Sequence, residues 1–528
     1  MKDRVSLTDF LMYHKETHPI SFHMPGHKGR STLYGIYGFG DFVKNVVGND
    51  ITEIPGADAL QQPRERIKDI MEGYAGLYGA KHTELLVNGS SAGLMASILG
   101  SVPRGGKLLM GRNSHKSVYG ALRLGGIDPV YIMPEIDGET GLQLGLDPDK
   151  IEAALIKDLD IKAVLVTSPN YYGVLSDIER IASIVHLHGR ILIVDQAHGA
   201  HLKFFDYLRS EDGLPHRAAE NCGADIVVDS THKTLLSFTG SAILNICTER
   251  PDVSRISELL RMLQTTSPSY LLMGSLDINQ QILRMDGYNL IKNWDADIKY
   301  FYEEAAQIAG LGLIDRIDLD ETKVSITMSA LGLSGPELAE ELEKRNIWVE
   351  LTHGDYVMLM TGLGNERGDY EDVLSALRDL SAHHGGRIQG VEPESSASKT
   401  ESAAQDDAAQ KQAKNEAQAA NKNASQPVDK IAELRTPSSD SALIEQLEQR
   451  KIPDTYEEIP LYSAEGRVLY ESIIPYPPGS PIACPGEVLS KSVILYIRDQ
   501  LVAQHVVLGV DEEGRVKVES DCVLFKEI

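Results

Sequence analysis

The sequence contains little cysteine, little basic charge and no long apolar run. Its cysteines, Cys222, Cys247, Cys484 and Cys522, lie far apart and form no CxxC pair, so we expect neither a structural zinc site nor a disulfide scaffold. The formal net charge of −26 argues against nucleic-acid binding, which requires a basic stripe. No run of about 18 apolar residues occurs, and the N-terminus lacks an apolar run of signal-peptide length. We therefore expect a cytoplasmic protein that binds neither nucleic acid nor a membrane.

Short apolar runs alternate with helix-length segments over the first half of the chain. The runs are TELLVNGS, KLLMGRN, PVYIMPE, KAVLVTSPN, RILIVDQAH and DIVVDSTHK. Strands that are rich in Val, Ile and Leu, and that are separated by helices, are typical of a mostly parallel sheet with helices on both faces. The sequence therefore predicts an α/β fold built on a large, mostly parallel sheet.

The 528 residues are enough for several domains. After a mainly helical stretch, strands and helices alternate again over a shorter region, which indicates a smaller α/β unit. A tract of Ala, Gln, Ser, Asn and Lys then lacks the large apolar side chains that pack a core, so we interpret it as a flexible linker. The predicted divisions are an N-terminal segment at 1–60, a large domain at 61–310, a small α/β domain at 311–392, a linker at 393–428 and a C-terminal domain at 429–528.

Ligands of such sheets bind beyond the carboxyl ends of the strands, and one of these ends can hold a phosphate. The apolar residues Leu85 to Val87 lead through Gly89, Ser90 and Ser91 into an apolar helix. Free N–H groups at the start of a helix, together with small hydroxyl side chains, bind anions. Because Ser is also a preferred N-cap, the alternative is an ordinary helix start.

Three further polar side chains follow predicted strands of the same sheet. Asp195 comes after an apolar strand and can pair with a cationic ring nitrogen, although a lone Asp at such a position is more often a helix cap. His115 follows another strand, where an imidazole can lie flat against an aromatic ring. Lys233, next to His232, can form a Schiff base if its surroundings keep the amine partly deprotonated.

A phosphate site, a stacking histidine, an aspartate and a Schiff-base lysine are together what pyridoxal 5'-phosphate requires of a protein. They occur here in the order of the aspartate-aminotransferase-like fold. A metal centre is not expected, because His198 and His201 have no carboxylate or cysteine at a known ligand spacing. The sequence therefore predicts a pyridoxal-phosphate enzyme.

Several motifs resemble those of the prokaryotic ornithine/lysine/arginine decarboxylases, which are pyridoxal-phosphate enzymes of fold type I. They are FHMPGHKG (22–29), DITEIPGADAL (50–60), NGSSAG (88–93), RNSHKSV (112–118), VDQAHGAH (194–201), DSTHKT (229–234), TTSPSYLLMGSLD (265–277) and YPPGSP with CPGE (476–487). The resemblance covers nearly the whole chain apart from 393–428 and matches the short form of the family, without an N-terminal receiver-like domain. It implies an aspartate-aminotransferase-like large domain, a smaller α/β domain and a C-terminal domain.

The resemblance also assigns roles to residues. Lys233 resembles the Schiff-base lysine, and Asp195 resembles the partner of the pyridine nitrogen. His115 resembles the residue that stacks on the ring, and His198 lies beside the ring in the same motif as Asp195. The residues implied to contact the phosphate are Ser90, Ser91, Ser230, His232 and, from the partner subunit, Ser267. The last contact implies a homodimer or a higher homo-oligomer.

The implied reaction is the decarboxylation of arginine, lysine or ornithine to the corresponding amine and carbon dioxide, as in polyamine biosynthesis. The electrons of the broken bond enter the cofactor, and Lys233 or His232 returns a proton to Cα. The distal cation of such a substrate should face a carboxylate, for which the candidates are Glu53, Asp58 and Glu487. Each of the three is equally well explained as a loop carboxylate or a helix cap.

The chain departs from the family at Gln196, because the usual motif is DEAH and the sequence here is DQAH. The amide keeps a hydrogen-bonding shape but loses a charge, which we expect to tune the site. Two alternatives remain open: another fold type I activity, such as that of an aldolase, lyase or aminotransferase, and a cofactor-binding scaffold that has lost catalysis. The presence of both Lys233 and Asp195 argues against the scaffold.

Overall fold

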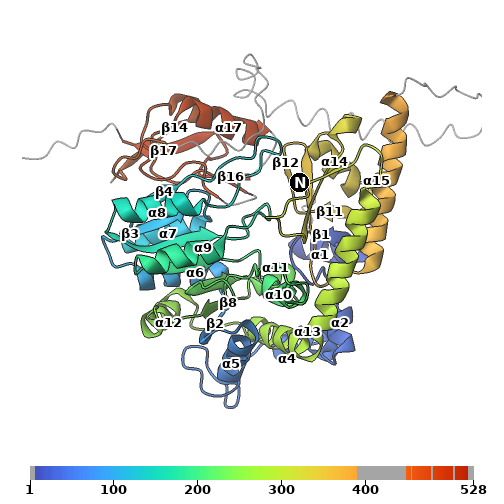
Figure 1. Cartoon of the computed structure of the whole chain (residues 1–528), viewed down its shortest axis with the longest axis horizontal. Helices are drawn as coiled ribbons and strands as arrows, with labels where there is room; N and C mark the ends of the chain where they lie inside the picture. Colours follow the sequence, from blue (N-terminus) through green and yellow to red (C-terminus); the bar gives the residue numbers. More distant parts are fainter. Residues whose placement is uncertain (1–5, 389–446, 454, 477–479, 503–505, 521–528) are drawn as a thin grey trace, which may run out of the picture.

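The computed structural model describes most of the chain, namely residues 6–388, 447–453, 455–476, 480–502 and 506–520. The predicted linker at 393–428 and Cys522 lie outside the described residues. Figure 1 shows three groups of elements: the large sheet with its helices, a smaller α/β unit and a C-terminal unit. Within the described part, no helix is long and apolar enough to cross a membrane.

A seven-stranded sheet lies at the centre of the large domain. Its strands, in spatial order, are β2 (His82–Leu86), β8 (Ala242–Ile246), β7 (Ile226–Asp229), β6 (Ile191–Asp195), β5 (Ile161–Thr167), β3 (Lys107–Gly111) and β4 (Asp128–Ile132). Strand β8 runs antiparallel to both of its neighbours, and the other pairs are parallel. The predicted α/β class with a mainly parallel sheet is thereby confirmed.

Helices cover both faces of this sheet because its strands place apolar side chains alternately on one face and the other. In β3, Leu108 and Met110 belong to one hydrophobic cluster, whereas Leu109 belongs to another. The helices are α6 (Gly89–Ser101), α7 (Lys116–Gly125) and α12 (Val253–Leu263) on the first face, and α8 (Pro148–Lys157) and α9 (Ile178–Leu187) on the second. Since both faces are covered, ligands reach the sheet only at the ends of its strands.

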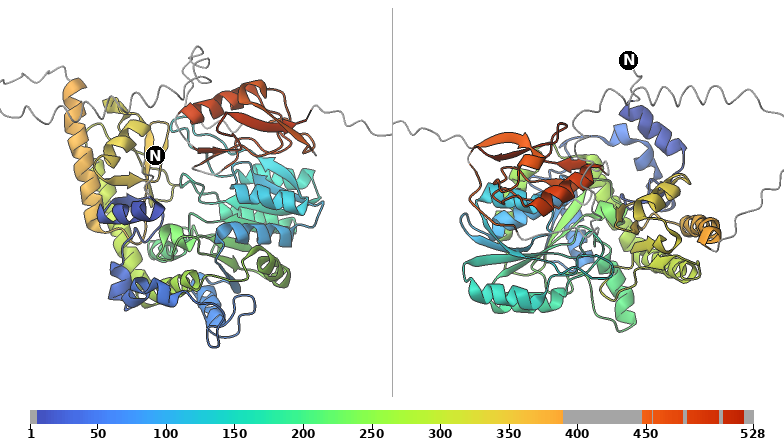
Figure 2. Two further views of the ribbon diagram at one scale, coloured as in Figure 1. Left: turned by 180° about the vertical axis from the view of Figure 1, so that it is seen from behind. Right: turned by 90° about the horizontal axis from the view of Figure 1, so that it is seen from above.

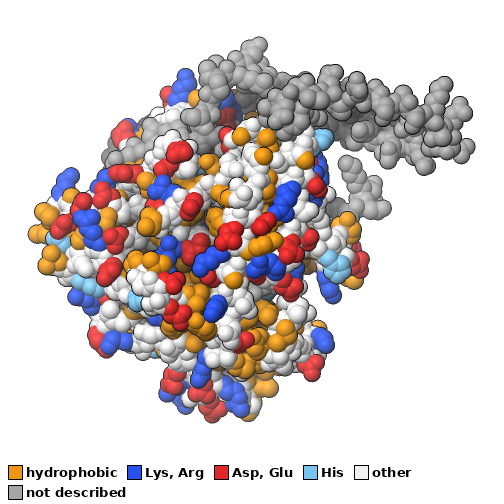
Figure 3. Space-filling view, turned by 45° about the vertical axis from the view of Figure 1, so that its right-hand side comes forward, with side chains coloured by type: hydrophobic (Ala, Val, Ile, Leu, Met, Phe, Trp, Pro, Cys, Tyr) orange, Lys and Arg blue, Asp and Glu red, His pale blue; other side chains and the backbone are white. Residues whose placement is uncertain are grey.

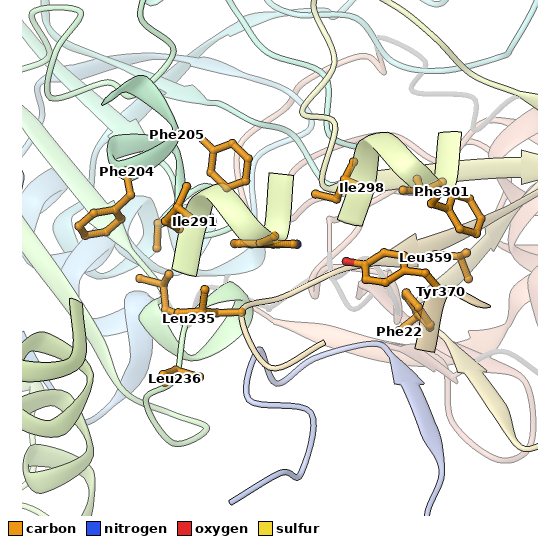
Figure 4. Packing of buried hydrophobic residues seen from close by; sticks show 14 of the residues in the cluster. Phe22, Phe204, Phe205, Leu235, Leu236, Ile291, Ile298, Phe301, Leu359 and Tyr370 are labelled. Atoms are coloured by element: carbon orange, nitrogen blue, oxygen red, sulfur yellow. The ribbon is translucent and has the colours of Figure 1, made fainter. Parts of the chain in front are cut away.

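A long helix connects the large domain to the small one. Helix α13 (Tyr270–Ala305) is kinked at Asp286, whose φ of −149° is not helical. The neighbouring helices are α5 (Arg66–Tyr78) and α10 (Leu202–Glu211). Figure 4 shows Phe205 of α10, Ile298 of α13 and Tyr370 of the small domain in one layer of buried side chains. The two domains therefore share an apolar core.

The small domain contains a four-stranded antiparallel sheet. Its order is β12 (Leu351–His353), β13 (Tyr356–Met360), β10 (Lys323–Thr327) and β9 (Gly312–Leu313). The accompanying helices are α14 (Gly335–Glu343), α15 (Arg367–Ile388) and the short 3-10 helix η1 (Ser329–Leu331). Helix α14 begins where the sequence provides a capping box, Ser334 with Glu337, which satisfies the first N–H groups.

The N-terminal segment packs against the small domain. Strand β1 (Ile20–Phe22) pairs in parallel with β11 (Ile347–Val349). The helices of this segment are α1 (Leu7–Glu16), α2 (Thr32–Ile36), α3 (Gly40–Lys44) and α4 (Val46–Asn49). After β1, the Gly26 N–H donates to the carbonyl of His232 over 2.8 Å. A Cβ at Gly26 would lie 2.4 Å from the Leu235 carbonyl oxygen, so only glycine allows this approach.

The C-terminal unit has a hydrophobic cluster of its own. Its elements are β14 (Tyr456–Pro460), the 3-10 helix η2 (Leu461–Ser463), β15 (Ile474–Tyr476), α17 (Lys491–Val502), β16 (Val506–Leu508) and β17 (Arg515–Glu519). Strand β14 pairs with β17, and β15 pairs with β16. Figures 1 and 2 show this unit in red, above one end of the large sheet and close to β4.

On the face drawn in Figure 3, Lys and Arg side chains are interspersed with Asp and Glu, and no basic stripe is visible there. This distribution accords with the net charge of −26. It resembles an ordinary solvated surface more than one built to collect a polyanion.

Candidate active site

A cavity of about 590 Å³ opens at the carboxyl ends of the large sheet. The predicted site residues that line it are Ser90, Ser91, His115, Asp195, His198, His232 and Lys233. They come from the starts of α6 and α7 and from the segments that follow β6 and β7. The wall is completed by the loop after β1, by residues 348–350 of the small domain and by Ser480 of the C-terminal unit. Four separate parts of the chain therefore meet at one edge of the sheet.

The start of α6 suits an anion. Gly89, with φ of +71°, allows the sharp turn from β2 into the helix, and Ser90 and Ser91 form its first turn. The Asn88 side chain does not cap this helix, because its oxygen accepts instead from the N–H of Thr265. The first N–H groups of α6 are therefore left for a ligand, and hydroxyl groups stand beside them.

Lys233 and Asp195 lie in the cavity without the partners that buried charges normally have. Lys233 is half-buried on the short helix α11 (Thr231–Thr234), and no described residue forms a hydrogen bond with its amine. Burial lowers the pKa of Lys233 to about 8, although Asp195 acts in the opposite direction. Burial also raises the pKa of Asp195, whose carboxylate accepts only the Ala197 N–H at 3.2 Å among the described groups. A cationic ring nitrogen would supply the missing partner.

Buried hydroxyl and imidazole groups near the cavity also lack partners. Ser230 Oγ, Thr167 Oγ1 and His198 Nδ1 are buried with no hydrogen bond inside the described structure. Such groups are costly unless something pairs with them. A polar ligand with a phosphate would fit, so the residues present agree with pyridoxal phosphate. Ser230 itself is buried next to the cavity and does not line it.

His115 is neutral and has a fixed tautomer. Its Nδ1 accepts from the Ser117 N–H at 3.2 Å as the N-cap of α7, so the proton is on Nε2. Burial and the neighbouring Lys233 lower the pKa of His115 to about 3. A neutral imidazole can pack on a cationic ring without repulsion.

His232 has the opposite tautomer. Its Nδ1 lies 2.6 Å from the carbonyl oxygen of Ser241, and since a carbonyl only accepts, Nδ1 carries the proton. Burial lowers the pKa of His232 to about 4. Nε2 of His232 is therefore an acceptor at neutral pH.

His198 is held through its main chain by a buried network. Its carbonyl accepts from Nζ of Lys323 at 2.9 Å, and Lys323 also pairs with Asp320 at 3.0 Å. Asp320 further contacts His201 at 3.1 Å, and all three side chains are buried. Burial alone would raise the pKa of Asp320, but His201 and Lys323 hold it well below its usual value. The network ties the segment after β6 to β10 of the small domain.

Gln196 is buried outside the cavity. Its Nε2 donates to Glu220 and to Asp229, at 3.0 Å each, and its Oε1 accepts from the Ala219 N–H at 2.8 Å. Burial and the neighbouring Glu220 raise the pKa of Asp229 well above its usual value. A glutamate at 196 would add a third carboxylate to this buried group. The Gln196 amide therefore suits this place, because it donates to the two carboxylates and accepts from the N–H.

The three carboxylates predicted for the substrate do not line the cavity of this chain. Asp58 accepts the N–H groups of Ala59, Arg64, Glu65 and Ile67. Glu487 is buried and forms a two-bond ion pair with Arg112, at 2.8 and 3.1 Å. Both side chains therefore have structural partners. Glu53 is exposed, and Ser267 is exposed in the loop before α13, so their roles stay predictions.

Sequence reasoning missed a carboxylate that does line the cavity. Glu350 follows β11, and its Oε2 accepts from the Met24 N–H at 2.9 Å while its Oε1 accepts from the Tyr171 hydroxyl at 3.0 Å. In the sequence, IWVELT is an ordinary apolar strand pattern. Nothing in that pattern indicates that this strand faces the large domain.

In the part of the chain that the structure describes, no three His, Cys, Asp or Glu side chains are grouped to hold a metal ion. The titratable groups of the cavity are instead arranged around its open space. They are His23, His115, Tyr171, Asp195, His198, His232, Lys233 and Glu350.

Comparison with known proteins gives matches over nearly the whole chain. The sequence model of a family described as Orn/Lys/Arg decarboxylase, major domain, matches residues 5–311, and the model of the C-terminal domain of that family matches residues 435–512. An arginine decarboxylase of Bacillus anthracis is 30% identical over 520 residues, which cover 95% of this chain and 94% of that protein. A lysine decarboxylase of Pseudomonas aeruginosa is 23% identical and covers 95% of this chain and 77% of that protein.

Solved structures show the same fold. The constitutive lysine decarboxylase of Escherichia coli has a TM-score of 0.67 at 19% identity and covers 97% of this chain and 81% of that one. The lysine decarboxylase of Francisella novicida has a TM-score of 0.67 at 18% identity and covers 93% and 76%. A sphingosine-1-phosphate lyase of Burkholderia pseudomallei, with a TM-score of 0.53 at 16% identity, covers 72% and 90%. These likenesses place the large domain in fold type I.

Proposed function

Because the chain belongs to the Orn/Lys/Arg decarboxylase family, we propose that it releases the α-carboxylate of a basic amino acid as carbon dioxide, with pyridoxal 5'-phosphate as its cofactor. Arginine is the first candidate substrate, since relatives 30% identical are named arginine decarboxylases; lysine and ornithine are the alternatives. The observation that carries the proposal is the single cavity that Lys233, Asp195, His115 and Glu350 all line.

The cofactor would be held at three places. Its phosphate fits the first turn of α6, where the N–H groups and the hydroxyls of Ser90 and Ser91 stand, with Ser230 close by. Asp195 would keep the ring nitrogen protonated, and neutral His115 would pack on the ring. When bound, pyridoxal phosphate supplies the electron sink for the bond to the carboxylate.

Lys233 is the better candidate for the proton that returns to Cα. Its pKa of about 8 lets the amine both give up and take back a proton near neutral pH. His232 has its proton on Nδ1, where the Ser241 carbonyl holds it. Of the two donors that the sequence left open, we therefore favour Lys233.

Glu350 is our candidate for the distal cation of the substrate. It is the carboxylate that the small domain contributes to the cavity, and the bonds from Met24 and Tyr171 fix its direction. A guanidinium or an ammonium would give it a charge-assisted partner. The two bonds favour neither a guanidinium nor an ammonium as the partner of Glu350, so arginine, lysine and ornithine all need to be assayed.

We further propose a cytoplasmic homodimer whose amine product is used for polyamine synthesis. The dimer is supported by Ser267, which is exposed on its own chain and therefore accessible to a second one. The location and the use of the product rest on the resemblance to the decarboxylase family.

The test is a spectrum followed by a gas measurement. Wild type incubated with pyridoxal phosphate should gain the absorbance band of covalently bound cofactor and should release carbon dioxide from arginine, lysine or ornithine. Lys233→Ala should lose both, whereas Lys157→Ala, at an exposed lysine of α8, should keep both. A band without gas from any of the three would favour the scaffold or another fold type I reaction. No band would refute the cofactor assignment.

A further inference from the structure

His23 lines the cavity, and neither the sequence motifs nor the cofactor gives it a role. It follows β1 in the segment FHMPGHKG and is half-buried. Its main chain is held firmly, because Nζ of Lys28 donates to the His23 carbonyl at 2.7 Å and to the Met360 carbonyl at 2.8 Å. The imidazole is therefore presented to the cavity from a fixed loop.

The tautomer of His23 follows from its neighbour. Nδ1 contacts the carbonyl oxygen of Met24 at hydrogen-bond distance, and a carbonyl can only accept, so Nδ1 carries the proton. Burial, and then the charge of Lys28, lower the pKa of His23 below its ordinary value, so the ring is neutral at pH 7. In this form Nε2 has a free lone pair. No residue in the described part of the chain forms a hydrogen bond with it.

His23 and Glu350 both bond to the main chain of one residue, Met24. The Met24 N–H donates to Glu350 Oε2 at 2.9 Å, while the Met24 carbonyl accepts from the His23 ring. The charge of Glu350 also acts on the imidazole, since it raises the pKa of His23 against the larger effect of burial, and both side chains line the same cavity. One acceptor is charged and the other is neutral.

We infer that Nε2 of His23 is a second hydrogen-bond acceptor for the distal cation of the substrate, next to Glu350. The inference rests on the proposed function and extends it to a residue that selects the substrate. An ammonium has three N–H donors and a guanidinium has five. Each oxygen of Glu350 already accepts one bond within the protein, so the carboxylate alone leaves donors unpaired. An unpaired donor in a half-buried site weakens binding.

The inference is tested by steady-state decarboxylation with arginine and lysine. His23→Ala should raise KM about tenfold, which corresponds to one hydrogen bond to a charged group, and should change kcat much less. His23→Gln should recover most of this loss, because the glutamine amide oxygen can take the place of Nε2. His188→Ala, at the end of α9 and outside the cavity, is the matched control and should behave as wild type. The absorbance band of bound cofactor should be the same in all four proteins.

Norleucine separates recognition of the cation from a general change in the cavity, because it has the four side-chain carbons of lysine without the ammonium group. Its inhibition constant should be unchanged by His23→Ala. An unchanged KM for the basic amino acids, or an equal loss of norleucine affinity, would overturn the role of His23. If wild type releases no carbon dioxide at all, the proposed function has failed, and this role fails with it.

Discussion

Burial keeps the histidines of the cavity neutral and lowers the pKa of the Lys233 amine towards physiological pH. The pKa of His115 is lowered to about 3 and that of His232 to about 4, in both cases mainly by burial. The pKa of Lys233, which burial lowers to about 8, lies close to physiological pH. The cavity therefore presents acceptors and one exchangeable proton, which suits proton return to carbon.

The lowered pKa of Lys233 predicts a pH-dependent stability. Between its folded value of about 8 and its ordinary value of 10.5, the unfolded chain binds more protons, so stability rises with pH in this window. Below pH 8 the cost of burying the ammonium is present in full. Cofactor-free Lys233→Met should therefore be more stable than wild type at pH 7, and the difference should shrink towards pH 10. Urea unfolding at the two pH values measures this, and a gain that grows with pH would contradict it.

Some residues of the cavity could be predicted from the sequence and others could not. Lys233, Asp195 and His115 were predictable because each follows an apolar run, and strand ends of a parallel sheet converge at one edge. Glu350 and His23 were not, because their position depends on how the small domain packs against the large one. That packing involves contacts far apart in the sequence, which no local pattern records.

At the scale of the elements, a buried network holds the segment after β6 against β10. It consists of Lys323, Asp320 and His201. Lys323 lies on β10 and reaches the carbonyl of His198, whose ring lines the cavity. The ring of His198 also packs edge-on against Tyr171, with centroids 4.9 Å apart. A buried ion pair thus fixes the position of a residue beside the cofactor site.

Removing Lys323 should therefore be costly. Lys323→Met leaves Asp320 buried without its ammonium partner, and we expect a loss of about 3 kcal/mol in the free energy of unfolding. Lys344→Met is the control: it breaks exposed pairs with Glu340 and Glu341 and should cost less than about 1 kcal/mol. Urea unfolding at pH 7 compares the two. Equal losses would show that the buried network does not stabilise the junction.

The helices of the small domain could be predicted from the sequence, whereas the connections between the units could not. The helical pattern GPELAEELEKRN covers α14 and runs three residues beyond its end, and YEDVLSALRDL lies within α15. In contrast, the N-terminal segment does not stand apart, because β1 pairs with β11 across more than 300 residues of chain. The kink at Asp286 in α13 has no proline to signal it.

At the scale of the whole molecule, the cavity is closed by docking the C-terminal unit on the large domain. Arg112, after β3, is buried against Glu487 and also donates to the carbonyls of Pro481 and Ile482. Ser480, in the same segment, donates to the Asn113 carbonyl at 3.0 Å and lines the cavity. The motifs RNSHKSV and CPGE are therefore two halves of one contact.

This contact gives Glu487 a structural role that can be separated from substrate binding. Glu487→Ala leaves a buried guanidinium unpaired, so we expect a loss of about 3–5 kcal/mol in stability. Differential scanning calorimetry, with Glu448→Ala as an exposed control in the same unit, measures the effect. A higher KM with unchanged stability would instead restore Glu487 as the substrate carboxylate.

The central claim, that this cavity removes the α-carboxylate and returns a proton to the same carbon, is tested most directly in heavy water. Cofactor-loaded wild type is incubated with arginine in D2O, and lysine and ornithine are assayed in parallel. The account predicts the corresponding amine with one carbon-bound deuterium, formed in equal amount with carbon dioxide. A keto acid, an aldehyde from side-chain cleavage, or deuterated amino acid without carbon dioxide would contradict it.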